Sequence, residues 1–196
     1  MVRGNCCWVR NPKLIEACRA VEQRSAQTLK NAERNNWLLD IALDHLTLSR
    51  AALYTAILEK SETRNSKSEI DQAVAGLRRA GAQEFIVRGL LTRAWLRFLT
   101  GARTGPESAQ SDLDEAWDIA ERGPMPLFMA DIHLHRARLF GMRSAGCGVR
   151  NEEAAYPWES PTADLAEARR LIEKHGYLRR KDELEDAEQA ITVGKP

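Results

Sequence analysis

Apolar residues return every three or four positions along most of this chain, with polar and charged residues between them. This spacing puts the apolar side chains on one face of an α-helix, and no stretch alternates long enough to predict a sheet. Helices are predicted over about 13–34, 37–60, 69–80, 84–99, 106–122, 125–140, 162–175 and 180–191.

The predicted boundaries depend on residues that cap or end helices. Ser68 is expected to cap the helix that follows it, and Pro106 suits a first helical turn because proline has no N–H to leave unpaired. Either Thr162 or Asp164 starts the seventh helix. Glycines at 81, 123 and 176 are expected to end helices.

A short acidic motif occurs three times, always on the second helix of a predicted pair. It reads Glu-Ile-Asp-Gln-Ala at 69–73, Asp-Leu-Asp-Glu-Ala at 112–116 and Asp-Leu-Ala-Glu-Ala at 164–168. Its final alanines are 43 and 52 residues apart. A pattern that returns at such intervals indicates helix pairs stacked in tandem.

The first helices of the pairs also align with one another. Small residues at equivalent positions would let neighbouring helices approach closely. These residues are Ser49, Ala94 and Ala137 in the first helices and Ala73, Ala116 and Ala168 in the second. Four residues before the first set stand His45, Leu90 and His133, so both histidines are expected to be packing residues.

This arrangement resembles the tetratricopeptide repeat over residues 13–192. The resemblance implies an all-α, right-handed solenoid of antiparallel helix hairpins, with about seven to eight helices. The copies exceed the family's period of about 34 residues, and the excess lies in loops at 61–67, 101–105 and 141–161. Residues 37–48 and 131–139 further resemble the carboxyl-terminal repeats of bacterial NACHT- or NB-ARC-type signalling ATPases. The chain has no GxxxxGK[ST] phosphate-binding loop.

One repeat domain is therefore expected, between an irregular segment at 1–12 and a tail at 193–196. Its last helix, about 180–191, is mostly polar and suits the exposed end of a solenoid. The 141–161 insertion is either functional or mobile, or an excursion whose Tyr156 and Trp158 fold back on neighbouring helices. The helix at 13–34 resembles a second helix without its partner, which residues 1–12 or another chain would cover.

Composition narrows the functional classes. The 29 basic and 28 acidic side chains give a net charge of +1, so no nucleic-acid partner is expected. The most apolar stretch, 37–58, is interrupted by Asp40, Asp44, His45 and Arg50, which argue against a membrane span. The absence of a signal peptide, and four cysteines without zinc-site spacing, predict a cytoplasmic protein with reduced thiols.

No convincing catalytic or metal-binding constellation emerges from the sequence. His133 and His135 point about 200° apart on a helix and are poorly placed to share a metal ion. Cys147 could be exposed in the insertion, but His175 is far away in sequence and nothing indicates a base beside the thiol. We therefore expect no cofactor, no metal and no enzymatic activity.

The expected function is non-catalytic binding of a peptide or partner protein on the first helices. Arginines with exposed aromatic rings are typical of an anchoring surface, here for an acidic peptide or a carboxyl terminus. Repeat register selects Arg50, Tyr54, Arg88, Leu91, Trp95, Phe98, Asp131 and Arg138. The simpler interpretation is that arginines of 84–103 pair with the acidic helix that follows.

Two alternatives remain open. The chain could be a regulatory or sensor part of a bacterial signalling ATPase or of a transcription regulator, acting in cis or in trans. It could also form a homo-oligomer if the helix at 13–34 presents its apolar face outward.

Overall fold

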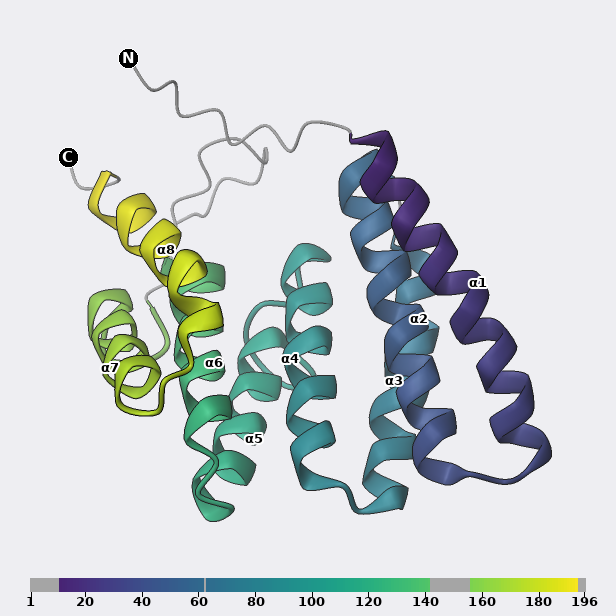
Figure 1. Ribbon diagram of the computed structural model, residues 1–196. Helices are drawn as coiled ribbons and strands as arrows, with labels where there is room; N and C mark the ends of the chain where they lie inside the picture. The colour runs from purple at the N-terminus through teal and green to yellow at the C-terminus, as the bar shows by residue number, and fades with distance from the viewer. Residues whose placement is uncertain (1–10, 62, 142–155, 194–196) are drawn as a thin grey trace. The chain divides into compact units, whose positions relative to one another are not determined.

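The computed structural model describes residues 11–61, 63–141 and 156–193, and this part of the chain contains helices and no strand. The helices are α1 (Pro12–Arg34), α2 (Leu38–Glu59), α3 (Arg64–Ala80), α4 (Gln83–Leu99), α5 (Ala109–Arg122), α6 (Pro126–Arg136), α7 (Pro161–Lys174) and α8 (Lys181–Val193) (Figure 1). A π-helical segment, Ala137–Gly141, continues α6, and a 3-10 turn, Leu178–Arg180, precedes α8. The all-α prediction is confirmed for these residues.

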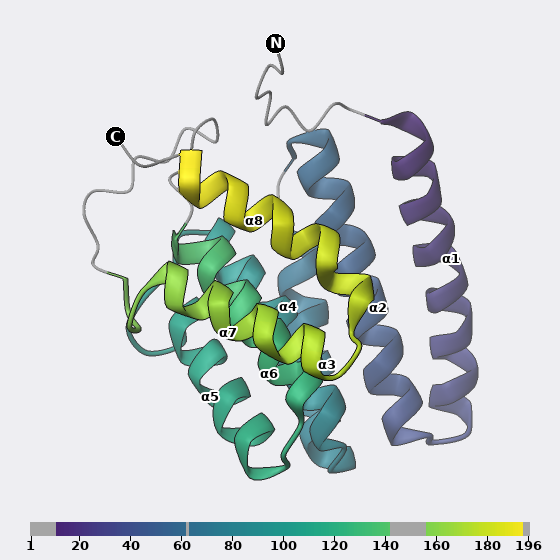
Figure 2. The same ribbon diagram turned by 60° about the vertical axis from the view of Figure 1, so that its left-hand side comes forward.

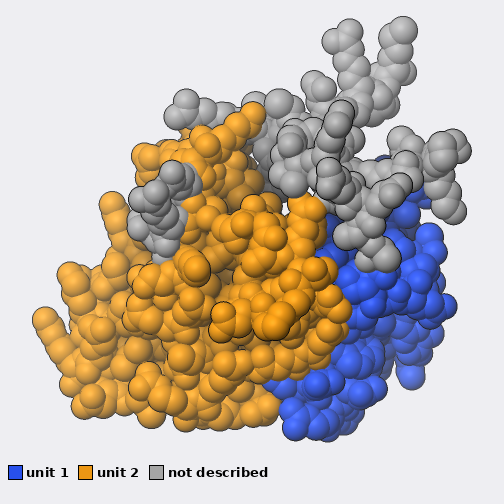
Figure 3. All heavy atoms as spheres, turned by 180° about the vertical axis from the view of Figure 1, so that it is seen from behind, with its two compact units in different colours: residues 1–7, 117–196 blue, residues 8–116 orange. Residues whose placement is uncertain are grey.

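The chain divides into two compact units. Unit 2 is Trp8–Ala116, and unit 1 is Met1–Cys7 with Trp117–Pro196 (Figure 3). In unit 2, α1 packs on α2, α2 on α3 and α3 on α4. In unit 1, α6 packs on α7, and α8 lies along α7 (Figure 2). Helices thus pack on their neighbours in sequence order, as in an α-helical repeat.

The small residues predicted to lie between helices are buried. They are Ser49, Ala73, Ala94, Ala116, Ala137 and Ala168. Helices α2 and α3 approach so closely that a β-carbon added at Gly76 would lie 2.8 Å from the β-carbon of Ala42. Small residues on the two helices make this close approach possible.

The core of unit 1 is built from apolar residues of α6, of the π-helical segment that continues it, and of α7 and α8. It consists of Ala130, Leu134, Ala137, Leu165, Ala168, Leu171, Ile172, Leu184 and Ala187, with Met129, Tyr177 and Ile191 packed against it. Leu184 and Ala187 are the buried side of α8, whose remaining residues are largely polar. A last helix with one apolar side and a polar outer side agrees with the capping role predicted for it.

The start of α3 differs from the prediction. The helix begins at Arg64, so the loop expected over 61–67 is shorter and Ser68 does not cap it. Ser66, in the first turn, is buried, and its carbonyl accepts a hydrogen bond from Ser49 Oγ at 3.1 Å. Contact with α2 therefore extends the helix over polar residues that have no apolar pattern.

Pro106 does not open α5. It lies in a turn, and α5 begins at Ala109. Ser108 Oγ accepts from Ser111 N at 3.1 Å, and Ser111 Oγ accepts from Ser108 N at 2.9 Å. This reciprocal cap satisfies free N–H groups at the helix start, which the proline cannot do.

The helix predicted over 125–140 is α-helical only to Arg136, where the π-helical segment takes over. Helix α7 begins at Pro161, a residue earlier than Thr162, because Ser160 Oγ accepts from Ala163 N at 3.0 Å. Gly81 follows α3 with φ of 71°, as expected for a glycine that ends a helix. The predictions for 1–10, Cys147 and most of the 193–196 tail lie outside the described residues.

Candidate interaction surface and buried clusters

The acid that opens each copy of the repeated motif pairs with a base on the preceding first helix. The pairs are His45 Nδ1 with Glu69 Oε2 (2.7 Å), Arg93 with Asp112 (2.7 Å) and His133 Nδ1 with Asp164 Oδ1 (2.5 Å). The two histidines occupy equivalent positions, as the register predicts. Their acidic partners come from the next motif copy, and sequence analysis did not identify this pairing.

The Asp112 pair is the most deeply buried of the three. Asp112 is 1% exposed, and Arg97 also reaches its Oδ1 at 3.0 Å. Burial would lower the pKa of Arg93, but the hydrogen bond and charge of Asp112 outweigh it and raise that pKa. Two arginines of α4 thus pair with the acidic helix α5, as the simpler interpretation of the basic helix expected.

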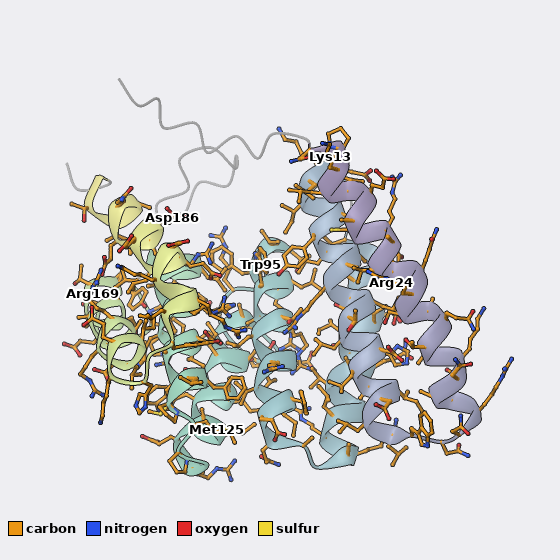
Figure 4. The ribbon with its side chains drawn as sticks, viewed as in Figure 1. Lys13, Arg24, Trp95, Met125, Arg169 and Asp186 are labelled. Atoms are coloured by element: carbon orange, nitrogen blue, oxygen red, sulfur yellow. The ribbon has the colours of Figure 1, made fainter. Side chains whose placement is uncertain are left out.

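Four of the predicted binding residues lie together on α2 and α4 of unit 2. Arg50 Nε donates to Thr92 Oγ1 at 2.9 Å, and a terminal nitrogen of Arg50 donates to the Arg88 carbonyl at 3.2 Å. The rings of Tyr54 and Trp95 meet edge to face, with centroids 5.5 Å apart. Trp95 is labelled on α4 in Figure 4. We call Arg50, Tyr54, Arg88 and Trp95 the α2–α4 surface.

Exposure varies among the predicted residues of this region. Tyr54 is 44% exposed, Trp95 is partly exposed and Arg88 is exposed. Phe98 is partly exposed, with the Arg103 guanidinium 4.6 Å from its ring centroid. Leu91 is 5% exposed, so its side chain contributes to packing inside unit 2.

The remaining two predicted residues belong to unit 1. Asp131 is buried and accepts from Arg180 Nε at 2.8 Å. Arg138 is exposed and pairs with Glu183 at 3.1 Å. Both side chains therefore connect α6 and the π-helical segment to the region of α8.

A polar and aromatic cluster surrounds Asp164 in unit 1, beside the end of the insertion. Asp164 accepts hydrogen bonds from the Tyr156 hydroxyl and from His133. Burial, and then the hydrogen bond to Asp164, raise the pKa of Tyr156 well above its ordinary value. The prediction that Tyr156 and Trp158 fold back on neighbouring helices is confirmed, because Trp158 packs edge to face on Phe140 at 5.1 Å.

This cluster does not have the arrangement of a nucleophilic triad. His133 Nδ1 contacts the carboxylate, as in a triad, so Nε2 would have to face a nucleophile. Within the described residues, Nε2 is buried without a hydrogen-bond partner, and the ring meets Trp117 edge to face at 4.9 Å.

The described residues also contain no group of three His, Cys, Asp or Glu side chains that could hold a metal ion. None of the helices in the described part is long and apolar enough to cross a membrane. Comparison with protein-family models, with curated proteins and with solved structures gave no match. The fold thus defines the class only as an all-α protein whose helices pack in sequence order.

Proposed function

We propose that the chain is a non-catalytic protein-interaction module, a right-handed, tetratricopeptide-like helical repeat that binds a peptide or partner protein on the α2–α4 surface. The observation that supports this proposal is the pair of rings, Tyr54 and Trp95, that meet across two helices while both stay partly exposed. Large aromatic rings beside arginine carry most of the binding energy in many protein interfaces.

The hydrogen bonds of Arg50 favour binding because they fix its side chain in advance. Its guanidinium is held by Thr92 and by the Arg88 carbonyl, both on α4. Less side-chain freedom is then lost when a partner docks. Arg88 is an exposed arginine of the same surface, with its guanidinium 5.4 Å from the Phe85 ring centroid, so the partner we infer combines a carboxylate with an aromatic or aliphatic side chain.

Self-association through α1 receives less support. Ile15 and Ala32 of α1 are buried, and α1 packs on α2. Lys13 and Arg24 are exposed polar residues on the same helix (Figure 4). A regulatory role in a signalling ATPase or a transcription regulator would use the same α2–α4 surface, with its partner in cis or in trans.

The test starts from peptides selected on the immobilised full chain from a random displayed library. The affinity of a selected peptide is then measured for the wild type, for Trp95→Ala and for Trp37→Ala. Trp37 is the matched control because it is 55% exposed and precedes Tyr54 by 17 residues, about 25 Å along a helix.

We expect Trp95→Ala to weaken binding at least about tenfold, as for an anchoring residue. Trp37→Ala is expected to change the affinity less than about twofold, because scattered surface residues contribute little. Equal affinities for both variants would place the binding site elsewhere and refute the proposal.

A further inference from the structure

Residues 156–160, which we call the strap, run without helical structure into α7. The strap is held to unit 1 by its two aromatic side chains. Tyr156 donates its hydroxyl hydrogen to Asp164, and the Trp158 ring packs on Phe140. The two strap rings also meet each other edge to face, at 5.4 Å. The strap thus contacts unit 1 through side chains, as a bound peptide would.

A buried arginine, Arg136, contacts the indole rings of both Trp117 and Trp158. The Arg136 guanidinium lies 5.1 Å from the Trp117 ring centroid and 4.6 Å from that of Trp158. Arg136 is itself buried. A guanidinium stacks well on tryptophan, and this attraction grows when water is excluded. Trp117 and Arg136 belong to the helices, whereas Trp158 is supplied by the strap.

The contact of Tyr156 with Asp164 is additional to the pairing found in every repeat. Glu69 and Asp112 hold positions equivalent to Asp164, and each pairs with bases of the preceding first helix. Asp164 has such a base in His133 and accepts from Tyr156 as well. The Tyr156 hydroxyl therefore makes a hydrogen bond to Asp164 that is not part of the repeated pairing.

We propose that Trp117, His133, Arg136 and Asp164 form a recognition site for an aromatic peptide of the form Tyr-x-Trp. The strap occupies this site in cis, and a partner segment of the same chemistry can take its place. The tyrosine hydroxyl donates to Asp164, and the indole covers Arg136. This site uses none of the residues of the α2–α4 surface, so it can be tested independently of the function proposed above.

Occupation in cis gives the strap a concentration advantage over any free peptide. A tethered segment has an effective concentration of about 1 mM or more, so a free peptide of equal contacts competes poorly. Removing the strap side chains without cutting the chain would open the site. Binding in trans should then become measurable.

The experiment uses a fluorescein-labelled peptide with the strap sequence, Tyr-Pro-Trp-Glu-Ser, and the full-length protein. Fluorescence polarisation compares the wild type with the double variant Tyr156→Ala/Trp158→Ala. We expect at least about tenfold tighter binding to the double variant, since it lacks the competing strap. A peptide with phenylalanine in place of tyrosine should bind it several-fold more weakly. A double variant that is folded by circular dichroism but binds no tighter than the wild type overturns the proposal.

A conservative variant keeps the proposal testable if the double variant does not fold. Tyr156→Phe retains the ring and removes only the hydroxyl, so it should bind the labelled peptide more tightly than the wild type does. Tyr177→Phe is the matched control, because it removes a hydroxyl that donates to another buried aspartate, Asp131, outside both proposed sites, and it should leave peptide binding unchanged. No gain with Tyr156→Phe, or an equal gain with Tyr177→Phe, contradicts the site.

Discussion

Replacing Gly76 by alanine should destabilise unit 2, although alanine is the better helix former. Gly76 lies inside α3, and its neighbour across the helix contact is Ala42 of α2. At an open helical position, the change from glycine to alanine would stabilise the protein by about 0.5–1 kcal/mol. The sign of the effect therefore reports how close the two helices are.

The magnitude follows from the distance between the two methyl groups. An added β-carbon would lie 2.8 Å from the Ala42 β-carbon, whereas carbon atoms in contact prefer about 3.5–4.0 Å. Both carbons are fixed to helix backbones and have no rotamer to escape into, so the helices themselves must move. Overpacking of this kind costs about 1–3 kcal/mol. After the helix-propensity gain, we expect a net loss of about 1–2 kcal/mol.

A second substitution tests whether contact with the Ala42 side chain causes this loss of stability. With Ala42→Gly, the nearest remaining atom is the Ala42 α-carbon position at 3.4 Å, which is the edge of ordinary contact. In that background, Gly76→Ala should stabilise the protein by about 0.5–1 kcal/mol. Urea unfolding of the four proteins by circular dichroism gives the free energies, and hydrogen exchange assigns the change to α2 and α3. The same sign in both backgrounds would refute the close approach.

Two further predictions concern buried ionisable groups. Asp112→Asn should cost about 1–3 kcal/mol in urea unfolding because it removes the buried carboxylate that pairs with two partly buried arginines, Arg93 and Arg97. Glu115→Gln, in an exposed pair on the same helix, should cost less than about 1 kcal/mol, and equal costs would contradict the burial argument. Burial lowers the pKa of His135, whose Nδ1 lies 2.8 Å from the Asp131 carbonyl oxygen. The contribution of neutral His135 to stability is therefore complete above pH of about 6.5 and is lost as the pH falls. His135→Gln should therefore lose less stability than the wild type between about pH 7 and pH 5, and equal losses would show that His135 is not responsible.

Periodicity and small residues predicted the helices and their packing positions well. Ser49, Ala94 and Ala137 could be aligned because a helical array repeats the same contact at the same height. Helix starts were harder to predict. Ser66 carries no apolar signal, yet its contact with Ser49 extends α3, and Ser108 caps α5 although Pro106 offers the stronger local signal.

The candidate sites were predictable only in part. Register placed Arg50, Tyr54, Arg88 and Trp95 on two neighbouring first helices, where they do meet. The cluster around Asp164 was accessible to the same reasoning only in part. The His133 pair repeats the contact of the other two motif copies, whereas Tyr156 comes from the insertion, which has no repeat counterpart from which to infer a contact.

The most direct test of the proposed function is a hydrogen-exchange footprint of the full chain with a selected peptide bound. Backbone amides that a ligand covers or rigidifies exchange more slowly. We predict protection in α2 around Arg50 and Tyr54 and in α4 from Arg88 to Trp95. Protection confined to α1, α7 or α8, with α2 and α4 unchanged, would contradict the α2–α4 surface as the binding site.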